Sequence, residues 1–220
     1  MSERSPTLLP GQHSCHFFED FNEQKRVALA FIKEGLENGD YCVYVTSDQP
    51  VDDWYLELQA YGVDVARERQ RGALDVISYV EYRRPGNFNS ILKAREVLTL
   101  AQAKLSEFAG VRLAGNGGWD TDPPLPPDEV THWEATADLL CDGEDLLVVC
   151  QYDLAHHSPQ TINAALRTHS VAMLNGVSRL NPYYEAPQIL ENEPNLNHSD
   201  ADARTIEDML TTLNSAPVAH

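Results

Sequence analysis

The chain has 220 residues, enough for one large domain or a domain with a tail, and its formal net charge of −18 repels phosphate backbones, so no direct nucleic-acid partner is expected. No apolar run approaches the length of a membrane span, and the first residues lack the apolar segment of a signal peptide. The four cysteines form no CxxC pair, and we expect a reduced, cytoplasmic protein without a membrane partner.

Segments with strand and helix patterns alternate along residues 12–187. Apolar runs rich in β-branched and aromatic residues predict strands at 14–18, 41–47, 73–82, 111–115 and 145–153. Apolar residues at helical spacing predict helices over 27–36, 50–61, 88–108, 130–140 and 162–169. Asn175-Gly176 separates two short apolar runs, which is typical of a β-hairpin.

Repeated strand–helix units predict a three-layer α/β/α fold with a mostly parallel central sheet, closed by the antiparallel hairpin at one edge. We divide the chain into a flexible lead at 1–11, a domain at 12–187 and an acidic tail at 188–220. A short helix is predicted near Thr205–Leu213, and we expect the tail to be mobile or to dock on a partner.

The turn after the first predicted strand, Glu19 to Gln24, stands where nucleotide-binding α/β proteins often hold phosphate. It contains no glycine, and its carboxylates repel a phosphate. The GxxxxGK[ST] motif is absent from the sequence. The glycine-rich stretch Gly115–Trp119 has no basic residue and is predicted to be a tight turn that exposes Trp119. We therefore expect no nucleotide and no other cofactor.

The carboxyl ends of the strands supply the candidate binding site, because ligands of open parallel sheets lie beyond those ends. The ends combine aromatic, amide and carboxylate side chains without lysine, which suits a small neutral or cationic organic ligand. The candidates are Phe18, Glu19, Asn116, Trp119, Tyr152 and Asp153. We expect the rings to enclose the ligand, Asn116 to hydrogen-bond it and the acids to set its charge preference. The alternative is that these positions are polar because the strands leave the core there.

Histidines and cysteines offer a different hypothesis, a zinc site. His13, Cys15 and His16 lie close in sequence, and His156 follows the last strand of the core. Strand alternation places His13 and Cys15 on one side and His16 on the other, so the candidate ligands are His13, Cys15 and His156. The simpler interpretation is that these histidines are structural or exposed.

Three further residues receive structural roles. Cys150 lies in an apolar run and is interpreted as a small hydrophobic residue. His169 falls on an apolar helical stripe and is interpreted as a core histidine. Arg167 and His169 are expected to hold the strand end through Asp153 or backbone carbonyls.

Several stretches, taken in order, resemble the MEDS sensory domain, the sensor half of DcmR-type regulators from methylotrophs and methanogens. They include GLENGDYCVYVTSD, VRLAGNGGW, VCQYD, LRTH and NPYY, and they run through residues 12–187. The resemblance implies a RecA/KaiC-like fold that has lost its phosphate loop and senses small organic molecules. Two positions depart from the family pattern: Asn116 stands where a glutamate is usual, and Trp133 replaces the tyrosine before Glu134.

Three hypotheses for function follow. The first is a stand-alone sensory domain that binds a small organic molecule and signals, without nucleotide hydrolysis, through a regulatory protein (a histidine kinase or transcription regulator) or through homo-oligomerisation. The second is a ligand-free adaptor that docks on such a regulator. The third is a metal-dependent enzyme built on the three zinc-site candidates. No other enzyme chemistry is expected, because no serine or cysteine has a well-placed base beside it in sequence.

Overall fold

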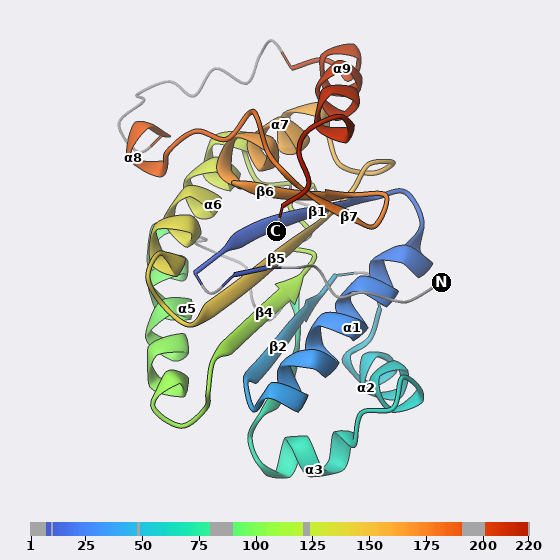
Figure 1. Ribbon diagram of the computed structural model, residues 1–220, viewed down its shortest axis with the longest axis vertical. Coiled ribbons are helices and arrows are strands. Elements are labelled where there is room, and N and C mark those ends of the chain that lie inside the picture. The colour runs from blue at the N-terminus through green and yellow to red at the C-terminus, as the bar shows by residue number, and fades with distance from the viewer. Residues whose placement is uncertain are drawn as a thin grey trace.

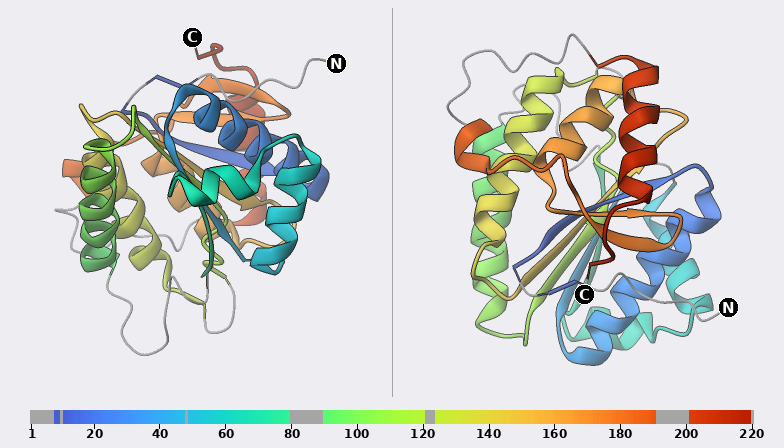
Figure 2. Two further views of the ribbon diagram at one scale, coloured as in Figure 1. Left: turned by 90° about the horizontal axis from the view of Figure 1, so that it is seen from below. Right: turned by 45° about the horizontal axis from the view of Figure 1, so that its top comes forward.

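The computed structural model describes residues 8–9, 11–47, 49–79, 90–120, 124–190 and 201–219. Two layers of helices enclose a central sheet (Figures 1 and 2). The strands are β1 (His13–Phe18), β2 (Tyr41–Thr46), β3 (Leu74–Ser78), β4 (Val111–Gly115), β5 (Leu146–Asp153), β6 (Val171–Leu174) and β7 (Val177–Leu180). The helices are α1 (Phe21–Asn38), α2 (Val51–Ala60), α3 (Val65–Gln70), α5 (Ser90–Leu105), α6 (Pro127–Cys141), α7 (Pro159–Thr168), α8 (Pro187–Leu190) and α9 (Ala203–Asn214).

The sheet has the order β3-β2-β4-β5-β1-β6-β7, and each neighbouring pair is parallel except β6 and β7. Apolar residues of α1 and α2 pack on one face of the sheet, and those of α5, α6 and α7 pack on the other. The predicted three-layer fold with a mostly parallel sheet is confirmed. None of the helices in the described part of the chain is long and apolar enough to cross a membrane.

The first strand–helix unit shows how the sequence sets local structure. The β1–α1 turn carries its own helix cap, because the Asp20 carboxylate accepts a hydrogen bond of 2.9 Å from the Asn22 backbone N–H. Helix α1 then buries an apolar stripe against the sheet and ends at Gly39, whose φ of 88° is left-handed. An aspartate thus lies at the position where a phosphate loop is expected in nucleotide-binding relatives of this fold.

The predicted hairpin is confirmed as β6–β7, with Asn175 and Gly176 both at positive φ (53° and 71°), as a type I′ turn requires. The helix expected near Thr205–Leu213 is α9, which packs on α7 and buries Ile206 and Leu213. Residues 201–219 therefore contact the domain through α9, whereas the sequence suggested a mobile tail or a helix that docks on a partner. The third strand ends earlier than expected, at Ser78, and 80–89 lie outside the described residues.

Candidate functional site: a buried polar cluster beside an apolar cavity

Four side chains from different elements meet between the sheet and helix α6. They are His13 of β1, Glu134 of α6, Cys150 of β5 and His169, which follows α7. Strands β1 and β5 are adjacent and in register, with Cys15 beside Cys150, so alternate residues of both strands face α6. We call these four residues the buried cluster.

The contacts within the buried cluster centre on the carboxylate of Glu134. Glu134 Oε2 lies 3.2 Å from His13 Nε2, 3.4 Å from Cys150 Sγ and 3.7 Å from His169 Nε2. His13 Nε2 is also 3.4 Å from Cys150 Sγ. The other carboxylate oxygen, Oε1, accepts a short hydrogen bond from the hydroxyl of Tyr152, and Glu134 also accepts one from Trp119.

Burial shifts the pKa values of these groups in the direction that favours their neutral forms. Desolvation lowers the pKa of His13 to about 4 and that of His169 to about 3, in the latter case helped by the nearby His13. The same desolvation raises the pKa of Glu134 and raises the pKa of the Cys150 thiol well above its usual value. At the 3.2 Å contact between His13 Nε2 and Glu134 Oε2, burial thus shifts both groups toward their neutral forms.

The tautomer of His169 follows from its surroundings. Its Nδ1 lies 2.8 Å from the Ala165 carbonyl oxygen, which can only accept, so Nδ1 carries the proton. The hydroxyl of Thr168 donates to the Ala164 carbonyl and accepts from the same Nδ1. The lone pair of Nε2 is left facing Glu134, and no described residue forms a hydrogen bond with this buried nitrogen.

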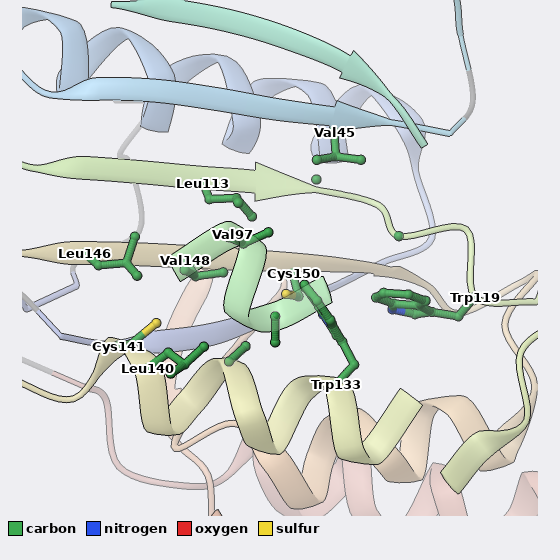
Figure 3. A pocket seen from close by; sticks show the side chains of 14 residues that line it. Val45, Val97, Leu113, Trp119, Trp133, Leu140, Cys141, Leu146, Val148 and Cys150 are labelled. Carbon is green, nitrogen blue, oxygen red and sulfur yellow. The ribbon is translucent and has the colours of Figure 1, made fainter. Parts of the chain in front are cut away.

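An apolar cavity of about 50 Å³ adjoins the buried cluster (Figure 3). The rings of Trp119 and Trp133 stand at one end of it, with centroids 6.1 Å apart, and Cys150 lies beside them. The remaining lining is Val45, Ala94, Val97, Leu113, Gly115, Gly117, Ala137, Leu140, Cys141, Leu146 and Val148. Trp119 and Cys150 each contact Glu134 as well, so they join the cavity to the buried cluster.

The expected exposure of Trp119 is wrong, because its side chain is only 3% exposed. The glycine-rich turn positions the ring inward. A Cβ atom at Gly117 would overlap the indole, and Gly118 has a φ of 58° and lies against Tyr79. The Asn116 side chain accepts a hydrogen bond of 2.9 Å from the Gly118 N–H and so shapes the turn.

A second hollow, of about 690 Å³, lies at the carboxyl end of β1 and is bordered by α9. Its lining includes Phe18, Glu19, Asp20, Glu23 and Ile206. Three carboxylates on the β1–α1 side make it unfavourable for a phosphate group. We call this hollow the acidic groove.

The six predicted binding residues do not share one pocket. Phe18 and Glu19 line the acidic groove, whereas Trp119 lines the apolar cavity. Tyr152 is fully buried and donates its hydroxyl hydrogen bond to Glu134. The side chain of Asn116 accepts a hydrogen bond within the glycine-rich turn. The remaining candidate, Asp153, is nearly buried, and its carboxylate accepts from the backbone of Ala155 and pairs with His156 at 2.7 Å.

The zinc candidates also separate. Of the three, His13 alone belongs to the buried cluster, because Cys15 Sγ contacts the Val171 carbonyl and the side chain of His156 is 73% exposed. Arg167 pairs with Glu185 at 2.6 Å, not with Asp153. Glu134 and Cys150 were not recognised as partners of His13 from the sequence, and neither was His169, since four residues from four elements have no common spacing.

His16 lies on the opposite face of β1, as alternation predicts. Its Nδ1 lies 3.1 Å from the side-chain nitrogen of Gln151, which donates, so the ring proton sits on Nε2. Nε2 faces the carboxylate of Glu23 at 3.8 Å. Burial lowers the pKa of His16, while Glu23 opposes that shift.

Comparison with known proteins identifies the family. The sequence model of MEDS, the "MEthanogen/methylotroph, DcmR Sensory domain", matches residues 12–170, well over half of the chain. The chain belongs to the MEDS family. A sensory or regulatory role follows for this MEDS domain from the family's description. All four residues of the buried cluster, together with Trp119, lie within the matched range.

The fold of this MEDS domain is similar to that of a KaiC-like protein, PH0186, from the hyperthermophilic archaeon Pyrococcus horikoshii OT3. Its crystal structure superposes with a TM-score of 0.55 and 14% identity, over 74% of this chain and 71% of that chain. At this identity the likeness concerns the fold alone. A search of curated proteins found no match.

Proposed function

We propose that this MEDS domain senses a small, uncharged organic molecule in the apolar cavity and passes the signal to a regulatory protein. The observation that carries the proposal is the position of Trp119 and Cys150, which line the cavity and also contact Glu134. A molecule in the cavity would touch the two residues through which it can disturb the buried cluster.

The cavity defines the chemical class of the ligand. A single water needs about 10–15 Å³ of such space, so about 50 Å³ accommodates a molecule of only a few heavy atoms. Its lining consists of apolar side chains and glycines, apart from the two indoles and two thiols. A charged ligand would lose its hydration without compensation, which favours an uncharged and largely apolar molecule.

The absence of nucleotide hydrolysis is part of the proposal. The β1–α1 turn presents Glu19, Asp20 and Glu23 to the acidic groove, and these carboxylates oppose binding of a triphosphate. The output would pass through a protein partner, such as a histidine kinase or transcription regulator, or through self-association.

Tryptophan fluorescence tests the proposal directly. Two of the three tryptophans, Trp119 and Trp133, border the cavity, whereas Trp54 packs on Tyr44 at 3.8 Å in the opposite core. Titration with xenon, short-chain haloalkanes and short-chain alcohols is expected to give a saturable change with at least one of these probes.

Space-filling variants provide the control. Ala137→Leu places a larger side chain in the cavity and is expected to abolish the response, whereas Ala103→Leu on the exposed face of α5 makes the same chemical change elsewhere and is expected to keep it. The proposal fails if no probe gives a saturable signal, or if the Ala137→Leu protein responds like the parent.

The adaptor hypothesis has its own observation, the acidic groove. Its carboxylates and its apolar wall of Phe18 and Ile206 suit a basic, amphipathic segment of a regulator. Under this alternative, Glu19→Gln with Glu23→Gln would weaken capture of the regulator, and Ala137→Leu would leave that capture unchanged.

A further inference from the structure

We propose that the buried cluster is a binding site for one zinc ion, with His13 Nε2, Glu134 Oε2, Cys150 Sγ and His169 Nε2 as its four ligands. This inference is independent of the ligand proposed for the apolar cavity. It replaces the set of His13, Cys15 and His156 that the sequence suggests.

The geometry is that of a tetrahedral site. With bonds of about 2.0–2.3 Å to zinc, neighbouring ligand atoms of a tetrahedron lie about 3.3–3.7 Å apart. The separations here are 3.2 Å (His13–Glu134), 3.4 Å (Cys150–Glu134), 3.4 Å (His13–Cys150) and 3.7 Å (His169–Glu134). All four residues offer ligand atoms within 4.8 Å of one another, so ligand movements of at most about 1 Å complete the site.

An unsatisfied nitrogen points to the ion. His169 Nε2 is fully buried, carries a lone pair directed at the cluster and has no hydrogen-bond donor among the described residues. A buried acceptor without a donor costs about 1–3 kcal/mol. Coordination of a cation supplies the missing partner.

Charge balance also fits a divalent ion. The Cys150 thiolate and the Glu134 carboxylate supply two negative charges, and the two histidines bind as neutral rings. Binding of Zn²⁺ therefore gives a site with no net charge, and the thiol and carboxyl protons leave to the solvent. Carboxylate-only sites suit magnesium or calcium, whereas a mixture of nitrogen, sulfur and oxygen ligands suits zinc.

Outer groups already hold the ligands in place. The Ala165 carbonyl fixes the ring of His169, and the Tyr152 hydroxyl binds the free oxygen of Glu134. Asp138 Oδ1 lies 3.8 Å from His13 Nδ1, while its other oxygen accepts a hydrogen bond of 2.6 Å from Tyr184. Carboxylates and carbonyls behind histidine ligands are the usual second shell of zinc sites.

Four protein ligands leave no open position, so the proposed role is structural or regulatory and not hydrolytic. The ion would join β1, β5, α6 and the end of α7, and two of these elements, β5 and α6, also line the apolar cavity.

The test uses the full chain, purified with reductant, stripped with chelator and then titrated with Zn²⁺ or Co²⁺. Native mass spectrometry is expected to show one zinc per chain. Cobalt is expected to give a thiolate-to-metal charge-transfer band and the strong visible bands of a tetrahedral site.

Cys150→Ala and Cys15→Ala form a matched pair, because the two residues are register partners on adjacent strands and face the same core. Since loss of a second-shell group alone weakens zinc sites about 10–100-fold, removal of the Cys150 ligand is expected to weaken binding by more than about 100-fold. The Cys15→Ala protein is expected to bind zinc like the parent. If Cys150→Ala does not fold, Glu134→Gln, which preserves shape and removes the charge, replaces it.

The inference is overturned if the parent binds no zinc, or if Cys150→Ala and Glu134→Gln bind zinc as tightly as Cys15→Ala. Ala137→Leu separates the two proposals, because it blocks the cavity without removing a zinc ligand. A protein that binds zinc and no small molecule disproves the sensor site alone, and the reverse result disproves the zinc site alone.

Discussion

Replacement of Trp119 by alanine is expected to destabilise the protein strongly. The side chain is 3% exposed, packs in the core shared by α6 and α7, and donates a hydrogen bond to Glu134. Removal of a buried aromatic side chain costs about 3–5 kcal/mol. For a domain of 150–250 residues, where 1 kcal/mol shifts Tm by about 2–4 °C, this corresponds to a fall of roughly 6–20 °C.

Urea unfolding followed by far-UV circular dichroism measures this free energy. Trp119→Phe separates the packing contribution of the indole from its hydrogen bond, because phenylalanine keeps most of the packing and lacks the N–H that binds Glu134. We expect Trp119→Phe to cost about 1–3 kcal/mol, the usual range for a buried acceptor left without its donor. A loss below about 1 kcal/mol in Trp119→Ala would show that the ring is not a core element, and the inward position of the glycine-rich turn would then be refuted.

Three more predictions use the same unfolding assay. Gly117→Ala inserts a methyl group against the indole of Trp119 and is expected to cost about 1–3 kcal/mol. Asp40→Ala removes the carboxylate that the Arg112 guanidinium, 7% exposed, binds at 2.8 Å and leaves it only the half-exposed Glu34 at 3.5 Å and a backbone carbonyl, so it is expected to cost up to about 3–5 kcal/mol. Burial lowers the folded-state pKa of His16 below 6.5, so stability is expected to fall as pH drops from 6.5 through that lowered value, because the unfolded chain takes up a proton first.

Each prediction has a contrary outcome. Unchanged stability in Gly117→Ala would mean that the turn relaxes around the methyl group. Glu34→Ala is the control for Asp40→Ala, because Glu34 is 48% exposed beside Arg112 and is expected to contribute less than about 1 kcal/mol. His16→Gln is expected to make the acid limb of the stability curve shallower by the contribution of one histidine, while His13 and His169 keep theirs, and an identical curve would contradict the contribution of His16.

The fold could be predicted because its signals are local. Strand β2 is an almost continuous apolar run, Asn175-Gly176 specifies its turn, and Gly39 ends its helix through a left-handed φ. The short helix α3 was missed, since its six residues are mostly polar and it depends on the Asp64 cap. Burial of α9 was also missed, because the low apolar density of the tail conceals a single apolar face directed at α7.

The candidate site could be predicted only in fragments. His13 and Trp119 were among the candidates, because one lies close in sequence to Cys15 and His16 and the other follows a glycine-rich turn. Glu134 could have been noticed as a carboxylate among apolar residues of a predicted helix. Cys150 could not, because it lies in an apolar strand in which a cysteine is an ordinary core residue. These side chains meet because β1 and β5 are adjacent and α6 packs across them. Neither the strand order nor the helix placement can be deduced from a single sequence.

The two proposals make a joint prediction, because Cys150 belongs to both the cavity and the buried cluster. If a molecule in the cavity moves the Cys150 thiolate or the indole that binds Glu134, it changes the affinity for zinc. Linkage then requires that zinc change the affinity for that molecule by the same factor. Coupling free energies of about 1–3 kcal/mol are usual, which corresponds to about 5–150-fold in affinity. Titrating the small molecule with and without zinc, and zinc with and without the small molecule, measures both factors. Equal factors different from one would identify the buried cluster as the element that reports cavity occupancy, whereas factors of one would show that the ion only holds the four elements together.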